Sequence, residues 1–421
     1  MSNLLPPLAP HQERAVEFIL THPYSICAVC MGGGKTRIAI EARKQLGLKA
    51  IVSCPSYLKL EWEQEIKKWD SGAKYFIDKG KVPESLSEYD IVVTSYGRLI
   101  HFEPFFESFD LVIVDEGQNM KNMAAKRTLD LHRLVYENSN KRVIVLSGTI
   151  IKNRVAEFYA NICLCNYNPK LKDPRFLKEY PDAVEFADKF SYRKEYQIEI
   201  RNRRVNVLTW EGHKNVPELK EHLRPIYFKV AAEDFLKVKE VSKIVQVASK
   251  DIEGLAAEFM ANEMNPDSVG GAAKRMSAEF TVDSTVKYVQ DLLNITRRVI
   301  VYTDYVEVSE RLAEAFGVPA INGNVPAIQR KLIANKFIEG LYPVLVATIP
   351  SFSTGVNLQC ANHMVFNDVC WSAGDLEQAK YRIKRLGQEE ICYYHYMSGS
   401  PQNSAILERL ASKIETIKVV T

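Results

Sequence analysis

A glycine run at Met31-Gly-Gly-Gly-Lys-Thr36 restricts the folds open to this chain more than any other stretch. It follows an apolar run, Ser25–Val29, that predicts a buried strand, and it precedes a predicted helix over Lys35–Gln45. Glycines between a strand and a helix let successive backbone N–H groups point at anionic oxygens, and the start of the helix adds partial positive charge. The stretch therefore predicts a phosphate-binding loop, with a lysine for the phosphate and a threonine for magnesium.

The match to the general phosphate-loop pattern is incomplete. The pattern G-x-x-x-x-G-K-[ST] requires glycine at position 29, where this chain has Val29. Taken alone, the stretch leaves open an ordinary glycine-rich turn.

Strands and helices alternate on the C-terminal side of this loop. Short apolar runs typical of buried parallel strands occur at Ala50–Cys54, Ile91–Thr94, Leu111–Val114 and Arg142–Leu146, with helical spacing between several of them. We therefore expect an α/β lobe with a parallel sheet over residues 1–165.

A second α/β series begins after Asn265-Pro-Asp-Ser-Val-Gly-Gly271 and lacks a glycine-lysine loop. Its expected elements are helix Thr285–Asn294, strand Val299–Thr303, helices Val306–Phe316 and Pro326–Glu339, strands Val344–Thr348 and Met364–Phe366, helix Asp375–Arg385, strand Ile391–Tyr396 and helix Gln402–Ile417. Since 421 residues exceed what one core usually supports, we expect a second lobe over 249–421, with a helical linker at 249–280. This lobe is expected to complete the nucleotide site of the first.

The α/β alternation is lost over 166–248, which we interpret as an insertion. Within it, Tyr196–Ile200 and Val205–Trp210 alternate like strands and flank Arg201-Asn-Arg-Arg204. The pattern predicts a β-hairpin with three arginines at its tip. They could contact phosphates or insert at a strand junction, although exposed charge at a turn is also common.

Two acidic residues, Asp115 and Glu116, directly follow the strand predicted at Leu111–Val114. The carboxyl ends of parallel strands form the edge of the sheet at which α/β folds bind ligands. One carboxylate there can hold a metal ion while the other activates water. An ordinary helix N-cap is the alternative.

Arg382 and Arg385 are three residues apart in a predicted helix and so share one of its faces. Arginines brought against a γ-phosphate stabilise the charge of a phosphoryl-transfer transition state. A solvated basic face remains the alternative.

The composition mainly argues against other classes of protein, such as membrane-spanning and disulfide-rich ones. The hydrophobic fraction of 46% and charged fraction of 25% are typical of a soluble globular protein, and the net charge of +3 does not indicate a polyanionic partner. No apolar run approaches the roughly 18 residues of a membrane span. The first residues do not place an apolar stretch after a basic flank, so we expect a protein that is not secreted. The eight cysteines are scattered through apolar runs, so we expect reduced core thiols in a cytoplasmic protein. The close pairs Cys27/Cys30 and Cys163/Cys165 leave zinc as an alternative that no nearby His or Cys cluster supports.

Taken together, the motifs and their order resemble the superfamily-two helicases, in particular the Swi/Snf-type DNA translocases. MGGGKT at 31–36 is similar to their MGLGKT, DEGQNMKN at 115–122 to DEGH-x-x-KN, and QAKYRIKRLGQ at 378–388 to QA-x-DR-x-HR-I-GQ. Further similar stretches are Pro10-His-Gln12, Cys54-Pro-Ser56 with Trp62 and Glu65, Ser147-Gly-Thr149 with Asn153, and Ser353-Thr-Gly-Val-Asn-Leu358. The resemblance covers residues 8–396 and implies two RecA-like lobes.

The resemblance implies a role for each matching residue. Catalysis would rest on Lys35, Asp115, Glu116, Arg382 and Arg385. ATP would be bound by Gln12, Gly32, Gly33, Gly34, Lys35, Thr36, Gly355, Arg382 and Arg385, with Gln12 reading adenine. Magnesium would be held by Thr36 and Asp115. The DNA backbone would be contacted at Thr94, Ser95, Tyr96, Thr149, Ser353 and Thr354.

The chain departs from the family pattern at several positions. The acidic pair before the loop is Val29-Cys30, the proline after SGT is Ile150, and the Asp before the first arginine is Tyr381. Gly212–Leu219 resembles a stretch of the annealing-helicase subgroup, but the Arg pair that usually follows is Phe228-Lys229. None of these changes removes a phosphate, metal or arginine-finger residue. The chain looks most like a minimal bacteriophage or bacterial motor.

We therefore expect a monomeric ATP-dependent helicase that remodels forks or four-way junctions in DNA repair, recombination or replication, with the hairpin arginines as a wedge. One alternative is a duplex translocase that displaces bound proteins without separating strands. Another is a nucleotide-dependent clamp that recruits partners, and RNA is a further candidate substrate because backbone contacts distinguish the polymers only through the 2′-hydroxyl.

Overall fold

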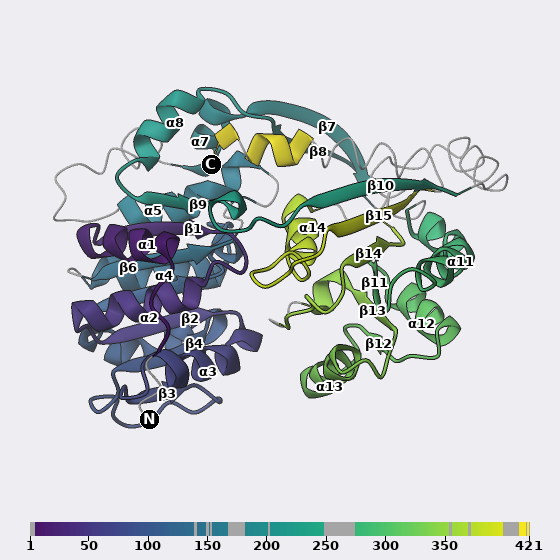
Figure 1. Cartoon of the computed structure of the whole chain (residues 1–421). Helices are drawn as coiled ribbons and strands as arrows, with labels where there is room; N and C mark the ends of the chain where they lie inside the picture. Colours follow the sequence, from purple (N-terminus) through teal and green to yellow (C-terminus); the bar gives the residue numbers. More distant parts are fainter. Residues whose placement is uncertain are drawn as a thin grey trace. The chain divides into compact units, whose positions relative to one another are not determined.

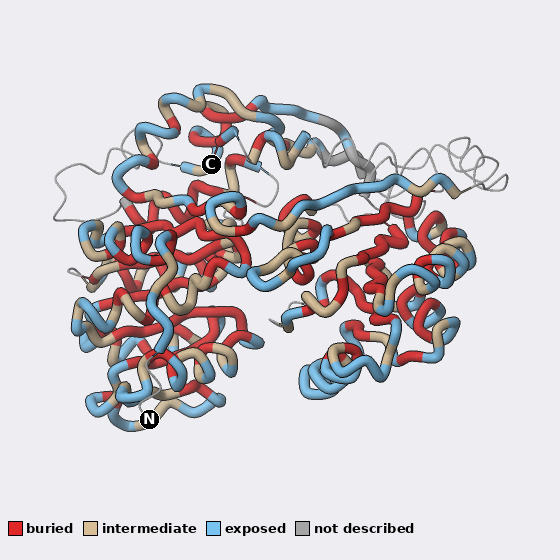
Figure 2. Tube along the Cα trace, in the orientation of Figure 1, coloured by how far each residue is buried: buried red, intermediate tan, exposed pale blue. Residues whose placement is uncertain are grey.

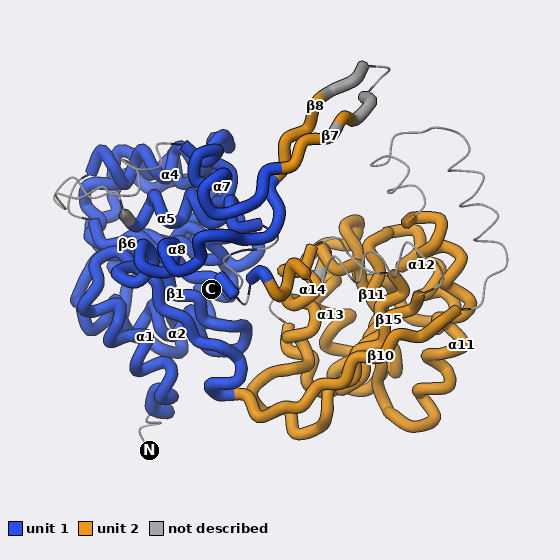
Figure 3. The backbone as a smooth tube through the Cα atoms, turned by 90° about the horizontal axis from the view of Figure 1, so that it is seen from above, with its two compact units in different colours: residues 1–193, 210–235, 416–421 blue, residues 194–209, 236–415 orange. Residues whose placement is uncertain are grey.

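The computed structural model describes the chain in several ranges separated by gaps. They are residues 5–138, 141–148, 151, 154–166, 182–200, 203–247, 274–352, 356–368, 372–398, 412–417 and 419–420. Two compact units result, one of residues 1–193, 210–235 and 416–421 and the other of residues 194–209 and 236–415 (Figure 3).

The first unit is built on a parallel sheet of seven strands in the order β3-β4-β2-β5-β6-β1-β9 (Figure 1). The strands are β1 (Tyr24–Val29), β2 (Ala50–Cys54), β3 (Tyr75–Ile77), β4 (Ile91–Ser95), β5 (Leu111–Asp115), β6 (Arg142–Ser147) and β9 (Tyr227–Val230). The α-helices are α1 (Pro10–Thr21), α2 (Lys35–Leu46), α3 (Lys59–Trp69), α4 (Lys126–Glu137), α5 (Tyr159–Asn166), α7 (Ala183–Phe190) and α8 (Val216–Leu223). Shorter 3-10 segments are η1 (Ser56–Leu58), η2 (Tyr96–Ser108), η3 (Gly117–Met120), η4 (Val155–Phe158) and η5 (Ala232–Asp234).

Both faces of this sheet are buried, which explains the continuous apolar runs in its strands. Side chains of β5 alternate between two clusters: Val112 and Val114 join one, and Leu111 and Ile113 join the other. Helices α1, α2 and α3 pack into the second cluster, while η2, α4, α5 and α7 pack into the first. Residues coloured as buried accordingly follow the strands of this sheet in Figure 2. The sheet is therefore a rigid support for the loops at its carboxyl edge.

The second unit holds a parallel sheet of six strands in the order β10-β15-β14-β11-β13-β12. The strands are β10 (Glu240–Gln246), β11 (Val299–Thr303), β12 (Ala320–Ile321), β13 (Val344–Thr348), β14 (His363–Phe366) and β15 (Cys392–Ser398). The helices are α11 (Val282–Leu292), α12 (Val306–Ala315), α13 (Ala327–Ile338), α14 (Ala373–Lys380) and the 3-10 turn η6 (Ile349–Phe352). Two parallel-sheet α/β lobes, as expected from the sequence, are thus confirmed.

The segment expected as an insertion over 166–248 contributes to both sheets instead. Strand β9 pairs with β1, with Ile26 opposite Tyr227, and β10 pairs with β15, with Glu240 opposite Cys392. Both strands interrupt apolar residues with charged or polar ones, so they lack the continuous apolar run that indicates a buried strand. The expected boundaries were therefore wrong here, and residues 416–421 also belong to the first unit.

A separate two-stranded sheet pairs β7 (Tyr192–Ile200) with β8 (Arg203–Glu211), and residues 194–209 of this hairpin are assigned to the second unit (Figure 3). The predicted hairpin is present, but β8 already begins at Arg203. Arg203 and Arg204 therefore lie in a strand and not at the tip. Arg201 lies outside the described residues, and the side chains of the other two are not described.

Helix α14 ends at Lys380, five residues before the expected end at Arg385. Arg382 and Arg385 follow it in a series of turns, so the expectation that they share a helix face was wrong. The expected linker helix 249–280 is described only from 274, and the final helix 402–417 only from 412, where both are helical. Within the described ranges, none of the helices combines the length and the hydropathy that a membrane crossing requires.

Candidate nucleotide site

The glycine loop joins β1 to α2 at the carboxyl edge of the first sheet. Gly32 and Gly34 have φ of 80° and 83°, values that favour glycine. A Cβ at Gly34 would also lie 2.2 Å from Nε2 of Gln12, so a side chain there would displace that amide. Helix α2 begins at Lys35 with no side-chain cap. Its first N–H groups are thus available to an anion.

Two side chains of helix α1 contact the backbone of this loop. Nε2 of His11 lies 3.0 Å and Nε2 of Gln12 lies 3.1 Å from the carbonyl oxygen of Gly33. The other side of the Gln12 amide accepts from the Ala9 N–H at 3.1 Å. His11 in turn stacks on Phe235 at 4.3 Å between ring centroids. In this structure Gln12 therefore shapes the loop, and its expected contact with adenine stays a prediction.

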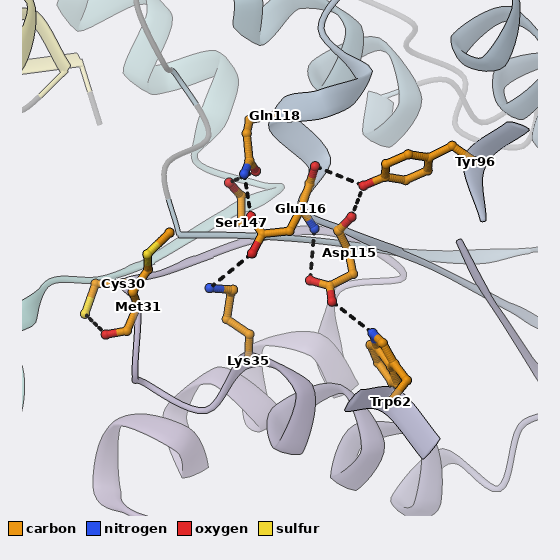
Figure 4. Close-up of polar contacts among 9 residues, drawn as sticks. All are labelled: Cys30, Met31, Lys35, Trp62, Tyr96, Asp115, Glu116, Gln118 and Ser147. Carbon is orange, nitrogen blue, oxygen red and sulfur yellow. Dashed lines mark hydrogen bonds and ion pairs between the residues drawn. The ribbon is translucent and has the colours of Figure 1, made fainter. Parts of the chain in front are cut away.

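Lys35 reaches from the start of α2 toward the end of β5. Its Nζ lies 4.0 Å from Oε1 of Glu116, and the two side chains are 11% and 16% exposed (Figure 4). The backbone beyond β6 also comes close, because a Cβ at Gly148 would lie 3.1 Å from Nζ. The amine and the carboxylate can therefore both reach one phosphate group placed over the loop.

Asp115 is the buried member of the acidic pair. Its Oδ2 accepts from Nε1 of Trp62 at 2.9 Å, and its Oδ1 accepts from the Glu116 N–H at 2.9 Å (Figure 4). Burial and then the neighbouring Glu116 charge raise the pKa of Asp115 to about 7, while Lys35 and Trp62 act in the opposite direction. A buried carboxylate of this kind gains from a nearby cation.

Glu116 is held through both its backbone and its side chain. Its φ of 55° places it in the left-handed region, which is rare for residues other than glycine. Nε2 of Gln118 donates to Oε2 of Glu116, and Oε1 of Gln118 accepts from the Ser147 hydroxyl at 2.5 Å. The second carboxylate oxygen, Oε1, faces Lys35. This network leaves Glu116 aimed at the space above the loop.

The three positions expected to contact DNA at the end of β4 differ in their surroundings. Thr94 is fully buried and donates to Oδ2 of Asp78 at 2.7 Å. The Tyr96 hydroxyl donates inward to the carbonyl oxygens of Asp115 and of Glu116, the latter at 3.0 Å. Ser95 instead lines a cleft. The structure therefore directs the hydroxyls of Thr94 and Tyr96 into the protein, and the expected contact of these positions with the DNA backbone stays a prediction.

That cleft has a volume of about 280 Å³ and opens beside the carboxyl ends of β2 and β4. It is lined by Cys54, Pro55, Ser56, Tyr57, Ser95, Tyr96, Gly97, Asn119 and Arg127. Arg127 is its only charged lining residue, and Nη2 of this side chain donates to the Asn119 carbonyl at 3.0 Å. Hydroxyls, an amide and one fixed guanidinium suit a phosphate group.

In the second unit, Arg382 is 8% exposed and its backbone carbonyl accepts from the Leu358 N–H at 3.0 Å. Nε of Arg385 donates to the Tyr381 carbonyl at 2.8 Å. Burial raises the pKa of Tyr302, and the charges of both arginines oppose that rise. The two arginines are thus three residues apart in the turns after α14, and they do not share a helix.

Five expected site residues lie outside the described residues: Thr149, Arg201, Ser353, Thr354 and Gly355. Their roles stay predictions.

The proposed magnesium ligands fit a hard cation in type and position. Thr36 is in the first turn of α2, and Asp115 ends β5, so an oxygen ligand stands on each side of the loop. In the described part of the chain there is no cluster of three or more His, Cys, Asp or Glu residues that could bind a metal unaided.

Several neighbours of the acidic pair were not predicted as functional. Trp62 received no role beyond its place in a motif-like stretch, and Gln118, Asn119, Arg127 and Phe235 received no role of their own. Gln118 had a signal, because it follows Glu116 by two residues inside a recognised motif. Arg127 and Phe235 had none, since only the tertiary fold brings them to the site.

Two family models match the chain in succession. The SNF2-related domain matches residues 11–264, and the helicase conserved C-terminal domain matches residues 284–387.

The described cysteines are free thiols, buried except for the partly exposed Cys360.

Similar curated proteins come from animals and bacteria. The SWI/SNF-related matrix-associated actin-dependent regulator of chromatin subfamily A-like protein 1 of Xenopus tropicalis is 26% identical over 418 residues, covering 93% of this chain and 42% of that protein. The putative ATP-dependent helicase/translocase YwqA of Bacillus subtilis is 24% identical and covers 93% and 46%. The DNA annealing helicase and endonuclease ZRANB3 of Bos taurus is 24% identical and covers 93% and 38%. The chain thus spans less than half the length of these relatives.

A solved structure, the Sulfolobus solfataricus SWI2/SNF2 ATPase core in complex with dsDNA, matches with a TM-score of 0.47 and 20% identity over 99% of this chain and 93% of that one. The SNF2-related model alone spans more than half of the 421 residues. The chain therefore belongs to the SNF2-related family, as the Swi/Snf-type motifs of its sequence indicated.

Proposed function

We propose that this protein is an ATP-driven DNA motor that remodels branched DNA such as forks and four-way junctions. The observation that carries the ATPase assignment is the convergence of Lys35, Asp115 and Glu116 on the glycine loop, with Nζ of Lys35 4.0 Å from Glu116. This is the arrangement of a phosphate-binding loop with a metal-binding and a water-activating carboxylate.

Each residue of the first unit then has a task in phosphoryl transfer. Backbone N–H groups at the start of α2 and Lys35 bind the phosphates, and Thr36 and Asp115 hold magnesium. Bound magnesium supplies positive charge against the phosphate oxygens. Glu116 orients the attacking water and accepts its proton. The Gln118 amide fixes one carboxylate oxygen of Glu116, so the other stays directed at the loop.

The second unit supplies the arginines in this proposal. Arg382 and Arg385 would stabilise the charge that develops on the transferred phosphoryl group. An arginine that acts this way must be positioned before the reaction, and the hydrogen bond of Arg385 to Tyr381 together with the burial of Arg382 supports such positioning.

DNA as substrate is supported by the cleft at the ends of β2 and β4 and by the named activities of relatives. ZRANB3 is named a DNA annealing helicase, and RAD54B of Gallus gallus, 23% identical over 494 residues, is named a DNA repair and recombination protein. Arg127 and Ser95 in the cleft can bind a backbone phosphate without reading sequence. The hairpin β7–β8 is the proposed wedge at a branch point.

The assignment is tested by ATPase rates of the purified chain with duplex, single-stranded, forked and four-way DNA in parallel, and with RNA of matched sequence. The proposal requires turnover that DNA stimulates, with the highest stimulation by branched forms. Lys35→Ala and Glu116→Gln should each abolish it. Full activity in either variant would falsify the ATPase site.

Strand separation is measured separately, on a labelled fork and on a duplex that carries a bound protein roadblock. Fork unwinding supports the branched-DNA role. Removal of the roadblock without unwinding identifies a duplex translocase, and negligible turnover with saturating ATP and DNA identifies a clamp.

A further inference from the structure

The cleft of about 280 Å³ and the acidic pair share one side chain, Tyr96. The residue begins η2 directly after β4, and it is only 7% exposed. It contributes to the cleft wall, while its hydroxyl points away from the cleft to the end of β5. A displacement of the β4–η2 junction therefore moves a group that touches the acidic pair.

The Tyr96 hydroxyl contacts the backbone of the acidic pair, and this backbone sets the position of the Glu116 side chain. It donates to the carbonyl oxygens of both Asp115 and Glu116 (Figure 4). Glu116 occupies the left-handed region with φ of 55° and ψ of 51°, a conformation that its surroundings must maintain. Two accepted hydrogen bonds at consecutive carbonyls hold the peptide that carries the Glu116 carboxylate.

The hydroxyl is a permanent donor. Burial raises the pKa of Tyr96 well above its usual value, and the charges of Asp115 and Glu116 raise it further. The phenol therefore stays protonated at physiological pH, and its two contacts respond to position rather than to titration.

The opposite wall of the cleft includes a residue of the segment that follows Glu116. Asn119 lies in η3, which begins one residue after Glu116, and its carbonyl accepts from Arg127. A phosphate bound between Ser95 and Arg127 would thus contact β4 on one side and α4 on the other, through the guanidinium that donates to the Asn119 carbonyl. Occupancy of the cleft and the position of Glu116 are then coupled, and the coupling acts in both directions.

We propose that Tyr96 is a positioning residue that couples occupancy of the cleft by a DNA phosphate to the water-activating geometry of Glu116. The inference rests on the proposed function, since it explains how DNA would stimulate ATP hydrolysis. It assigns Tyr96 a role in the rate of the reaction, in addition to the contact with the DNA backbone expected for this position.

The test substitutes Tyr96→Phe, which keeps the buried ring and removes only the hydroxyl. ATPase is measured against duplex DNA concentration at saturating ATP, which separates the saturated kcat from the DNA concentration for half stimulation. The ratio of saturated kcat to the DNA-free rate should fall about tenfold, as for the loss of one hydrogen bond that acts in the transition state. The half-stimulation concentration should stay within about twofold.

Two further variants separate coupling from binding and from general damage. Arg127→Ala removes a cleft cation and should raise the DNA concentration for half stimulation, whereas Tyr96→Phe should not. Tyr89→Phe makes the same chemical change in the first unit, where Tyr89 packs against Phe76, and should change neither quantity. Thermal unfolding of all variants shows whether the first unit stays folded.

The outcomes are distinct. Wild-type ATPase that DNA does not stimulate overturns the proposed function and the coupling with it. Stimulation that Tyr96→Phe retains in full overturns the coupling alone. A Tyr96→Phe variant whose half-stimulation concentration rises at unchanged saturated ratio shows a DNA contact, and likewise overturns the coupling.

Discussion

At the scale of single residues, the acidic pair is controlled by neighbours that only the fold brings to it. Trp62 is 1% exposed and donates to Oδ2 of Asp115 from helix α3, 53 residues earlier in the chain. The indole N–H satisfies one buried carboxylate oxygen and keeps the carboxyl oriented. A tryptophan placed at helical core spacing thus also serves the site.

We predict that Trp62→Phe costs about 2–4 kcal/mol of folding stability and lowers ATPase activity, because it leaves a buried carboxylate oxygen unpaired and opens a cavity. The matched control is Trp69→Phe on the same helix, whose indole donates to Glu65 at 2.6 Å near the surface. The control should cost less and leave turnover intact. Urea unfolding and ATPase rates measure both; equal effects of the two changes would contradict the assigned role.

A second residue-scale prediction concerns acid stability. Burial lowers the pKa of His132 to about 4, below its ordinary 6.5. The folded state therefore binds fewer protons than the unfolded state between these values, so its stability falls as pH decreases below about 6.5. This one histidine should account for a loss of about 2 kcal/mol by a pH of about 5.

The slope of the free energy of unfolding against pH is measured by urea unfolding across that pH window. His132→Gln removes the titrating ring and should flatten the slope, while His101→Gln at an exposed position should retain it. An unchanged slope in His132→Gln would show that other groups control acid unfolding.

At the scale of elements, the turns after α14 present the second unit's arginines. We predict that Arg382→Ala lowers ATPase activity by roughly a hundredfold or more while stability changes little, because this arginine's proposed task arises only in the transition state. Lys384→Ala is the neighbouring control: it removes an ion pair with Glu240 of β10 at 3.0 Å and should affect stability more than turnover. The reverse pattern in steady-state kinetics and thermal unfolding would show that Arg382 is structural.

The hairpin is the second element with a proposed task. Replacing Arg201, Arg203 and Arg204 together by Ala should reduce fork unwinding per ATP hydrolysed and leave the ATPase rate near that of the wild type. Arg224→Ala, whose side chain is 81% exposed on α8's C-terminal side, controls for the loss of surface charge. Unchanged unwinding per ATP in the triple variant would make the hairpin a structural element only.

The sequence predicted those parts of the site whose residues are adjacent in the chain or stand at strand ends. Lys35, Asp115 and Glu116 belong to this group, because local order alone places them at one edge of a parallel sheet. The end of α14 could not be predicted, because QAKYRIKR continues a helical pattern; in the fold, the Arg382 carbonyl accepts instead from the distant Leu358 N–H. The inward direction of Thr94 depends likewise on Asp78, whose partner role has no sequence signal.

At the scale of the whole molecule, the net charge of +3 offers little long-range attraction to DNA. Binding must therefore depend on local groups such as Arg127. We predict that the DNA concentration for half stimulation rises with salt as a power law whose exponent reports the number of phosphate contacts, about 0.9 per contact. Arg127→Ala should lower that exponent by about one. ATPase titrations at several salt concentrations measure it, and an exponent that Arg127→Ala leaves unchanged would place the phosphate contact elsewhere.

The two side chains of α1 that hold the Gly33 carbonyl have a consequence for nucleotide capture. They hold this oxygen toward α1, so the loop backbone keeps its shape before a phosphate arrives. A loop shaped in advance loses little conformational entropy when its ligand binds. Capture should then be governed by diffusional encounter, and the lifetime of the bound nucleotide, rather than the speed of its arrival, would set the protein's preference among nucleotides.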